Sequence, residues 1–400
     1  MNSDKRKKII IIGASVLGVI LIGTGIFFFF RGDSQNSEQS FFGRLFGGDM
    51  PVIPGEGDGI ETLPRPNTPA EGEGPRLNRV SEEPVIGATF IPDTDKIKYF
   101  KKATGHLFEN TYDGLNERRA SNITIPAIQK ALWSPSKEYA VLSYYTDGDI
   151  RHFYTKYSGT TTAESGFLPP SLTSITMSAE RDVMAYTLPV NGETAVITAR
   201  PDNTAQSTIL RTSIPDIILA FPGSQTLSIQ TKGSAYAEGY LYTLTTPNGN
   251  LVNVLGEIYG LSSLWSPDIN TVLYFSTNQN GNSPSLNLYS KNTGVVRTLS
   301  MTTLPEKCVW SSREEEHILY CGIPDKLPRT TLPDAWWQGT VSFSDSIWRI
   351  NLDTNEQIKL IDTSELNVDA VHLFTSGDAS HLFFTNKKDG SLWSYRLTGL

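Results

Sequence analysis

The feature that most constrains the fold of this chain is a unit of about 44 residues that recurs from Phe90 to the C-terminus. Each copy has an apolar strand ending in an aromatic residue, then a polar turn and a second apolar strand, most clearly at Trp265-Ser-Pro-Asp. The aromatic or equivalent markers stand at positions 90, 133, 177, 221, 265, 310 and 374. A period near 44 with several short strands per unit predicts the blades of a β-propeller.

The spacing of the markers predicts seven blades. The last spacing, from 310 to 374, exceeds one period by about twenty residues, which indicates an insertion rather than a further blade. Only 26 residues follow Phe374, enough for three strands, and residues 76–89 supply the missing length. We therefore expect an all-β, seven-bladed propeller over 76–400 in which an N-terminal strand, 76–81, closes the last blade and leaves no exposed sheet edge.

An uncharged run of 22 residues, 9–30, predicts a single N-terminal transmembrane helix. As a helix it would span about 33 Å, the thickness of the bilayer hydrocarbon. The basic tail 1–8 predicts a cytoplasmic N-terminus and an extracytoplasmic propeller, so the expected location is the cell membrane, crossed once. A cleavable signal peptide is the alternative, but no alanine lies between Ala14 and Ala70 to form a usual cleavage site.

Residues 31–75 are rich in glycine, proline and acidic residues, and they predict a disordered stalk between the anchor and the propeller. The whole chain has a net charge of −8, while the tail is basic, so the remainder is more acidic still. An acidic surface is a poor match for phosphate backbones, and we expect no nucleic-acid partner.

The repeats also carry a family resemblance. The Trp-Ser-Pro-Asp hairpin resembles the WD-like repeats of TolB and related bacterial propellers, over residues 76–400. The stretch from Cys308 to Cys321, with PDAWWQG at 333–339 and VSFSD at 341–345, is similar to uncharacterised membrane-anchored propeller proteins of candidate-phyla bacteria. This resemblance implies a topology and a fold, and it brings no known activity.

The insertion in the sixth repeat is the predicted binding site. Long loops on a rigid scaffold are where binding residues concentrate. The adjacent indoles could form a stacking platform, and neighbouring polar side chains could add hydrogen bonds; the residues concerned are Asp334, Trp336, Trp337, Gln338 and Asp345. In the alternative, one tryptophan fills the central channel or covers a blade, and the insertion is architecture.

The two cysteines, Cys308 and Cys321, are predicted to face each other across the hairpin that follows Trp310. A disulfide is then plausible outside the cytoplasm, and two buried thiols are the alternative. No Cys or His spacing supports a metal site, and nothing in the sequence indicates a cofactor.

Catalytic motifs are missing from the sequence: there is no GxSxG nucleophile elbow, and the five histidines are spread over four repeats. We therefore expect no enzymatic activity, and a membrane-anchored binding or scaffolding module whose partner is an envelope protein or a glycan. The alternative is a propeller-type glycan hydrolase or lyase with carboxylates at the central channel.

Overall fold

The computed structural model describes residues 75–398, apart from 122, 159–160, 314–316 and 364. These residues belong to the unit Pro69–Leu400. The predicted tail 1–8, the anchor 9–30 and the stalk up to residue 74 lie outside the described residues.

The predicted membrane location is not upheld. In the part of the chain that the structure describes, no helix is long and apolar enough to cross a bilayer. The run 9–30, on which that prediction rested, lies outside this part. The single-pass location is therefore withdrawn.

The fold is all-β, as predicted. The strands, a single-turn α-helix and a short 3-10 helix are, in chain order, β1 Leu77–Ser81, β2 Val85–Phe90, β3 Lys96–Lys101, β4 Leu107–Thr111, β5 Arg118–Arg119, β6 Ile128–Trp133, β7 Tyr139–Thr146, β8 Asp149–Ser158, β9 Thr161–Phe167, β10 Ile175–Met177, β11 Met184–Val190, β12 Glu193–Ala199, β13 Ser207–Thr212, β14 Ile217–Ala220, β15 Thr226–Thr231, β16 Glu238–Thr245, β17 Leu251–Trp265, β18 Thr271–Thr277, β19 Ser285–Ser290, β20 Val296–Thr298, η2 Pro305–Lys307, β21 Cys308–Trp310, β22 Ile318–Pro324, α2 Asp334–Trp337, β23 Asp345–Asn351, β24 Gln357–Ile361, β25 Ala370–Thr375, β26 His381–Asn386 and β27 Leu392–Arg396.

The strands follow from local sequence. β14 alternates buried and exposed residues along its length, the period-2 pattern of a strand with one covered face. Tight hairpins occur where the turn residues tolerate positive φ: Asn191 and Gly192, at φ 53° and 84°, connect β11 to β12. Both positions then suit a type I′ turn, whose twist matches the flanking strands.

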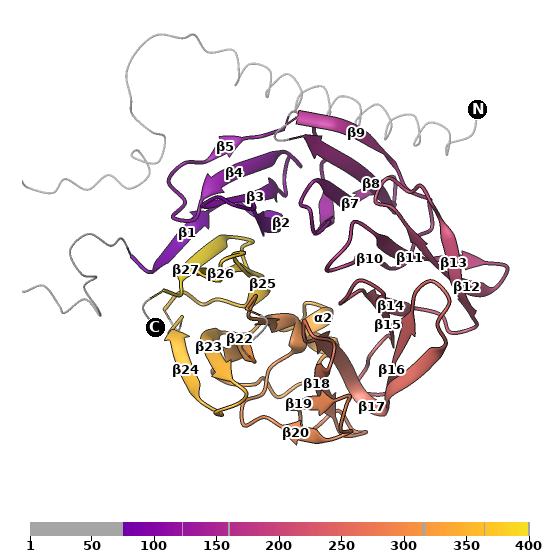
Figure 1. Ribbon diagram of the computed structural model, residues 1–400. Helices are drawn as coiled ribbons and strands as arrows, with labels where there is room; N and C mark the ends of the chain where they lie inside the picture. Colours follow the sequence, from indigo (N-terminus) through magenta and orange to yellow (C-terminus); the bar gives the residue numbers. More distant parts are fainter. Residues whose placement is uncertain (1–74, 122, 159–160, 314–316, 364, 399–400) are drawn as a thin grey trace, which may run out of the picture. The chain divides into compact units, whose positions relative to one another are not determined.

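Within the described residues the strands form six antiparallel sheets, which Figure 1 shows around a common centre. Five sheets have four strands each: β2-β3-β4-β5, β6-β7-β8-β9, β10-β11-β12-β13, β21-β22-β23-β24 and β1-β27-β26-β25. The sixth has seven strands, β14 to β20, because the long strand β17 pairs with β16 along its first part and with β18 along its last part. β1 pairs with β27, so the first and last strands of the described residues share a sheet.

The core lies between consecutive sheets. One apolar cluster, for example, joins Phe100 and Leu107 of the first repeat to Ile128 and Leu142 of the second. Burial of both faces of each sheet in this way is the main stabilising contribution, at about 25 cal/mol for each Å² of apolar surface removed from water.

The connections between strands lie on two opposite sides of the sheets. Successive connections in an antiparallel sheet leave from opposite ends of its strands. Two kinds of connection therefore lie on one side of the sheets: the one between the second and third strands of a sheet, and the link from one sheet to the next. We call this side the insertion face, because it carries residues 325–344 between β22 and β23. The turn between first and second strands lies on the other side, the turn face.

Candidate functional site

The insertion is anchored to two sheets besides its own. The carboxylate of Asp334 accepts hydrogen bonds of 2.8 Å from Ser234 Oγ and from the backbone N–H of Ala235, in the connection between β15 and β16. On its other side, Lys387 in the β26–β27 turn donates from Nζ to the carbonyl oxygen of Trp336 at 2.6 Å. These contacts hold α2 on the inner side of the ring of sheets (Figure 1).

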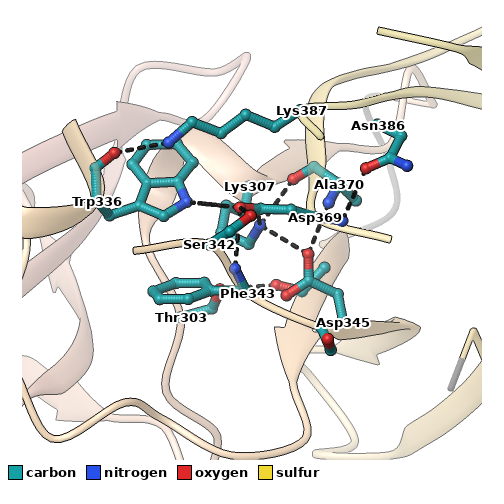
Figure 2. Close-up of polar contacts among 12 residues, drawn as sticks. Thr303, Lys307, Trp336, Ser342, Phe343, Asp345, Asp369, Ala370, Asn386 and Lys387 are labelled. Atoms are coloured by element: carbon teal, nitrogen blue, oxygen red, sulfur yellow. Dashed lines mark hydrogen bonds and ion pairs between the residues drawn. The ribbon is translucent and has the colours of Figure 1, made fainter. Parts of the chain in front are cut away.

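A buried ion cluster contacts the insertion, as Figure 2 shows. Lys307, at the end of η2, has no exposed side-chain surface, and its Nζ lies 2.7 Å from Asp345 Oδ2. The same ammonium pairs with Asp369, whose side chain is also fully buried, and donates to the carbonyl oxygen of Ala370 at 3.0 Å. Buried charges need close, hydrogen-bonded partners of opposite charge, because desolvation costs several kcal/mol per ion.

The cluster holds two carboxylates against one ammonium, and the two carboxylates respond differently. Burial raises the pKa of Asp345 to about 6, against the opposing attraction of Lys307. Burial also acts on Asp369, but Lys307 and hydrogen bonds from Phe343 N and Ser342 Oγ, each 3.0 Å, hold its pKa below the usual value. Asp369 is therefore the carboxylate that stays ionised, and Asp345 is the one that takes up a proton first.

Trp336 covers this cluster. Its side chain is 6% exposed, and its indole N–H donates to the Asp369 carboxylate at 3.1 Å from Oδ2. The ammonium of Lys387 lies 3.7 Å from the centre of the indole ring, a cation–π contact. Trp336 is therefore part of the protein core and does not face solvent.

Trp337, the next residue, borders an open cavity that we call the insertion pocket. The pocket has a volume of about 660 Å³ and is lined by Ile218, Lys232, Gly233, Ser234, Glu306, Asp334, Trp337 and Gln338. The half-buried indole of Trp337 donates its N–H to Glu306 Oε1 at 3.0 Å. Gly233 is required beside it, because a Cβ there would lie 1.9 Å from the carbonyl oxygen of Leu261.

Glu306 is the chemically distinctive group of the insertion pocket. Its carboxylate also accepts from Ser262 Oγ at 3.2 Å. The side chain reaches solvent through the pocket, yet protein atoms crowd it on the other sides, and this desolvation raises the pKa of the carboxyl. A carboxyl that is open to a cavity and holds its proton more tightly than usual is suited to donate a proton or a hydrogen bond.

The five predicted site residues therefore do not share one surface. Asp334, Trp337 and Gln338 line the insertion pocket, although the carboxylate of Asp334 is engaged in holding the insertion in place. Trp336 and Asp345 lie in the core, so the two indoles do not form the predicted platform: Trp336 is buried, and Trp337 borders the insertion pocket. The physical reason is that the single turn of α2 places neighbouring side chains on different sides of the helix.

Cys308 and Cys321 stand opposite each other in the β21–β22 register, as predicted, and a disulfide with an S–S distance of 2.10 Å joins them. Within the described part of residues 75–398, no group of three or more His, Cys, Asp or Glu side chains is placed to hold a metal ion.

Sequence reasoning missed Lys232, Glu306, Lys307 and Asp369. A usable signal was present for three of them. Glu306 and Lys307 directly precede the inner strand β21, and Asp369 directly precedes β25. Such links between sheets lie on the same side as the insertion, so charged residues at the start of these inner strands could have been assigned to it.

Comparisons with known proteins support the fold. No protein-family model matches the chain, and a search of curated proteins finds no relative. Among solved structures, an oligogalacturonate lyase in complex with manganese is 11% identical with a TM-score of 0.55, over 81% of this chain and 91% of the lyase. Oligogalacturonate lyase from Vibrio parahaemolyticus is 9% identical with a TM-score of 0.53, over 80% and 90%.

TolB from Acinetobacter baumannii, the propeller that the repeats resemble, has a TM-score of 0.41 at 12% identity, over 78% of this chain and 63% of TolB. That value is too low to carry an argument. The two lyases, whose TM-scores exceed one half, show that the fold is propeller-like; at 9–11% identity they show nothing more.

The prediction that this chain is not an enzyme is withdrawn, because the same comparisons show that its fold also occurs in enzymes. It rested on missing sequence motifs, whereas two solved structures that share the fold with TM-scores above one half are lyases. Catalytic residues often lie on loops that a rigid scaffold positions, so the absence of a local motif does not exclude activity.

Proposed function

We propose that the insertion pocket binds a glycan, and that glycan recognition is the function of this domain. The observation that carries the proposal is the indole of Trp337 at the edge of an open cavity of about 660 Å³, held in place by Glu306. An indole presents a flat apolar surface of the kind on which the C–H faces of sugar rings stack.

The remaining lining supports the same ligand class. Lys232 and Gln338 are exposed at the pocket and supply donors and an acceptor for sugar hydroxyls. Ile218 adds an exposed apolar patch. One aromatic surface with a few convergent polar groups in a cavity of several hundred Å³ is a usual arrangement for a small-molecule site.

A second candidate function is cleavage of the bound glycan, and Glu306 is the observation that favours it. Desolvation raises the pKa of this carboxyl, which is the property required of a general acid in the pocket. Asp334 is a weaker candidate for a second catalytic carboxylate, since Ser234 and Ala235 occupy it. The names of the similar solved structures, oligogalacturonate lyases, agree with this class of substrate.

Glycan binding is tested by titrating short neutral oligosaccharides and short oligogalacturonates into the protein and measuring heat and tryptophan fluorescence. Trp337→Ala should abolish binding. Trp393→Ala is the matched control, because Trp393 is also half-buried but lies in β27, outside the pocket. Absence of binding by every oligosaccharide tested, or equal affinity of Trp337→Ala and the native protein, would refute the proposal.

Cleavage is tested separately by following new reducing ends and the ultraviolet absorbance of an unsaturated sugar product. Glu306→Gln keeps an acceptor for the Trp337 indole but removes the titratable proton. This variant should bind glycan and fail to cleave it. If the native protein forms no product from an oligosaccharide that it binds, cleavage is excluded and binding stands.

We also infer that the sheets make up seven blades closed by the N-terminal strand. Division of the seven-stranded sheet within β17 would yield the fourth and fifth blades. Closure is supported by the pairing of β1 with β27 and by an apolar cluster that joins Val80 and Ile97 to Phe383 and Leu392. Kinship with uncharacterised propellers of candidate-phyla bacteria remains a proposal that rests on the sequence of residues 308–321 and 333–345.

A further inference from the structure

A second cavity lies on the turn face, at the opposite end of the sheet that contacts the insertion through Lys387. It has a volume of about 670 Å³ and lies between the β2–β3 turn and the β25–β26 turn. Aromatic side chains form its walls: Phe90, Tyr112 and His381. The Tyr112 and His381 rings lie 4.9 Å apart between centroids, and the Tyr112 hydroxyl donates to the carbonyl oxygen of Thr94 at 3.1 Å, which fixes the ring.

Three carboxylates stand around these aromatic walls: Asp93, Asp95 and Asp378. In the described part of the chain, none of the three forms an ion pair with a Lys, Arg or His. Hydrogen bonds from Ser376 and Ser380 hold the pKa of Asp378 below its usual value, so this carboxylate is ionised at neutral pH.

One wall of the cavity, Phe90, already has a cation as a neighbour. The Nζ of Lys137, from the neighbouring repeat, lies 5.0 Å from the centroid of the Phe90 ring, within cation–π distance. His381 does not oppose a cation, because burial lowers its pKa and leaves the imidazole neutral at pH 7. Burial, Asp378 and Asp95 together raise the pKa of Tyr112 to about 12, so the negative field reaches the aromatic wall.

We propose that this turn-face cavity binds an organic cation that carries a guanidinium or ammonium group, such as an arginine or lysine side chain. Aromatic rings attract cations, and the carboxylates would neutralise the charge of the ligand. An uncharged carbohydrate has no positive charge for the carboxylates to neutralise, so the ligand class differs from that of the insertion pocket.

The charge requirement is tested with two peptides of the same shape, acetyl-Gly-Arg-Gly-amide and its citrulline counterpart, in which the guanidinium is replaced by a neutral urea group. Binding to the full chain is followed by calorimetry. The arginine peptide should bind at least about tenfold more tightly than the citrulline peptide, and its affinity should fall as salt is added. Equal binding of the two peptides would overturn the proposal.

The site is tested with Asp93→Asn/Asp95→Asn, which keeps the shape of the cavity and removes two charges. Among the described residues, neither side chain has a hydrogen-bond or ion-pair partner, so the melting temperature should not change. The control is Glu82→Gln/Glu193→Gln, two exposed residues outside the cavity with the same change in charge. Asp93→Asn/Asp95→Asn should bind the arginine peptide about tenfold more weakly, which is the usual contribution of two exposed carboxylate–cation contacts.

An equal loss in the control variant would show a general charge effect and overturn the proposal, as would full affinity in Asp93→Asn/Asp95→Asn. Arginine amide distinguishes the sources of the ligand. If it binds as tightly as the peptide, the cavity takes a free small cation; if only the peptide binds, the ligand is a basic protein segment.

Discussion

Adjacent tryptophans with different environments give a direct test of how the insertion is built. Trp336→Ala removes a side chain that is 6% exposed and packs against Phe343, whereas Trp337→Ala removes a half-buried side chain at the edge of the insertion pocket. Both substitutions delete the same atoms one residue apart, so a difference between the two variants reports their surroundings.

The expected loss for Trp336→Ala has two parts. Truncation of a buried tryptophan costs about 3–5 kcal/mol in unfolding free energy. Loss of the indole donor also leaves the buried Asp369 carboxylate short of one hydrogen bond, an additional cost of about 1–3 kcal/mol that overlaps with the first. A loss of about 4 kcal/mol corresponds to a fall in Tm of roughly 8–16 °C. For Trp337→Ala we expect a fall of at most about 4 °C.

Thermal unfolding by near-ultraviolet circular dichroism, under identical buffer conditions, measures both values. Trp336→Phe is the matched control: it keeps an aromatic ring in the core but loses the N–H donor, and so it should lie between native protein and Trp336→Ala. Equal Tm values for the two alanine variants, or a Trp336→Ala variant within about 2 °C of the native protein, would refute the assignment of Trp336 to the core.

Three further predictions concern the same framework. The raised pKa of Asp345 contributes stability that is fully present below about pH 3.8 and is lost as pH rises through about 6. In urea unfolding, the native protein should therefore gain stability relative to Asp345→Asn as pH falls from 7 to 5, and no change would refute this. Reduction of the Cys308–Cys321 bond, or Cys308→Ser/Cys321→Ser, should lower the unfolding free energy by about 2–4 kcal/mol, and an unchanged urea midpoint would contradict a stabilising bridge. Deletion of residues 76–82 removes β1 and exposes one edge of β27, so Tm should fall and aggregation on heating should increase, which light scattering would detect.

The strands and their order could be predicted because each repeat carries its own local signals. The Trp-Ser-Pro-Asp copy at Trp265 marks the end of one strand and the turn into the next, and the structure places β17 and β18 there. The Cys308–Cys321 pairing followed from simple counting along a hairpin. Periodicity and turn chemistry act over a few residues, so one sequence is enough to read them.

The site was less predictable because it depends on contacts between distant residues. The sequence alone cannot distinguish Trp336 from Trp337, since they are adjacent and chemically identical. Their roles are decided by Asp369 and Glu306, which lie 33 and 31 positions away along the chain. Asp345 shows the same limitation: as an isolated aspartate it indicates a polar surface, and only Lys307 explains why it is buried.

The attachments of the insertion also have a consequence for the order of folding. Asp334 and Ser234 are separated by 100 positions, and Trp336 and Lys387 by 51, so the insertion joins parts of the chain that are far apart in sequence. We expect contacts between such distant positions to form late, because the entropy cost of closing the intervening chain must be overcome first. A partly assembled chain would then already contain most of its strands and still lack the pocket beside Trp337. Ligand capture would therefore select the finished molecules in a population that also holds incomplete ones.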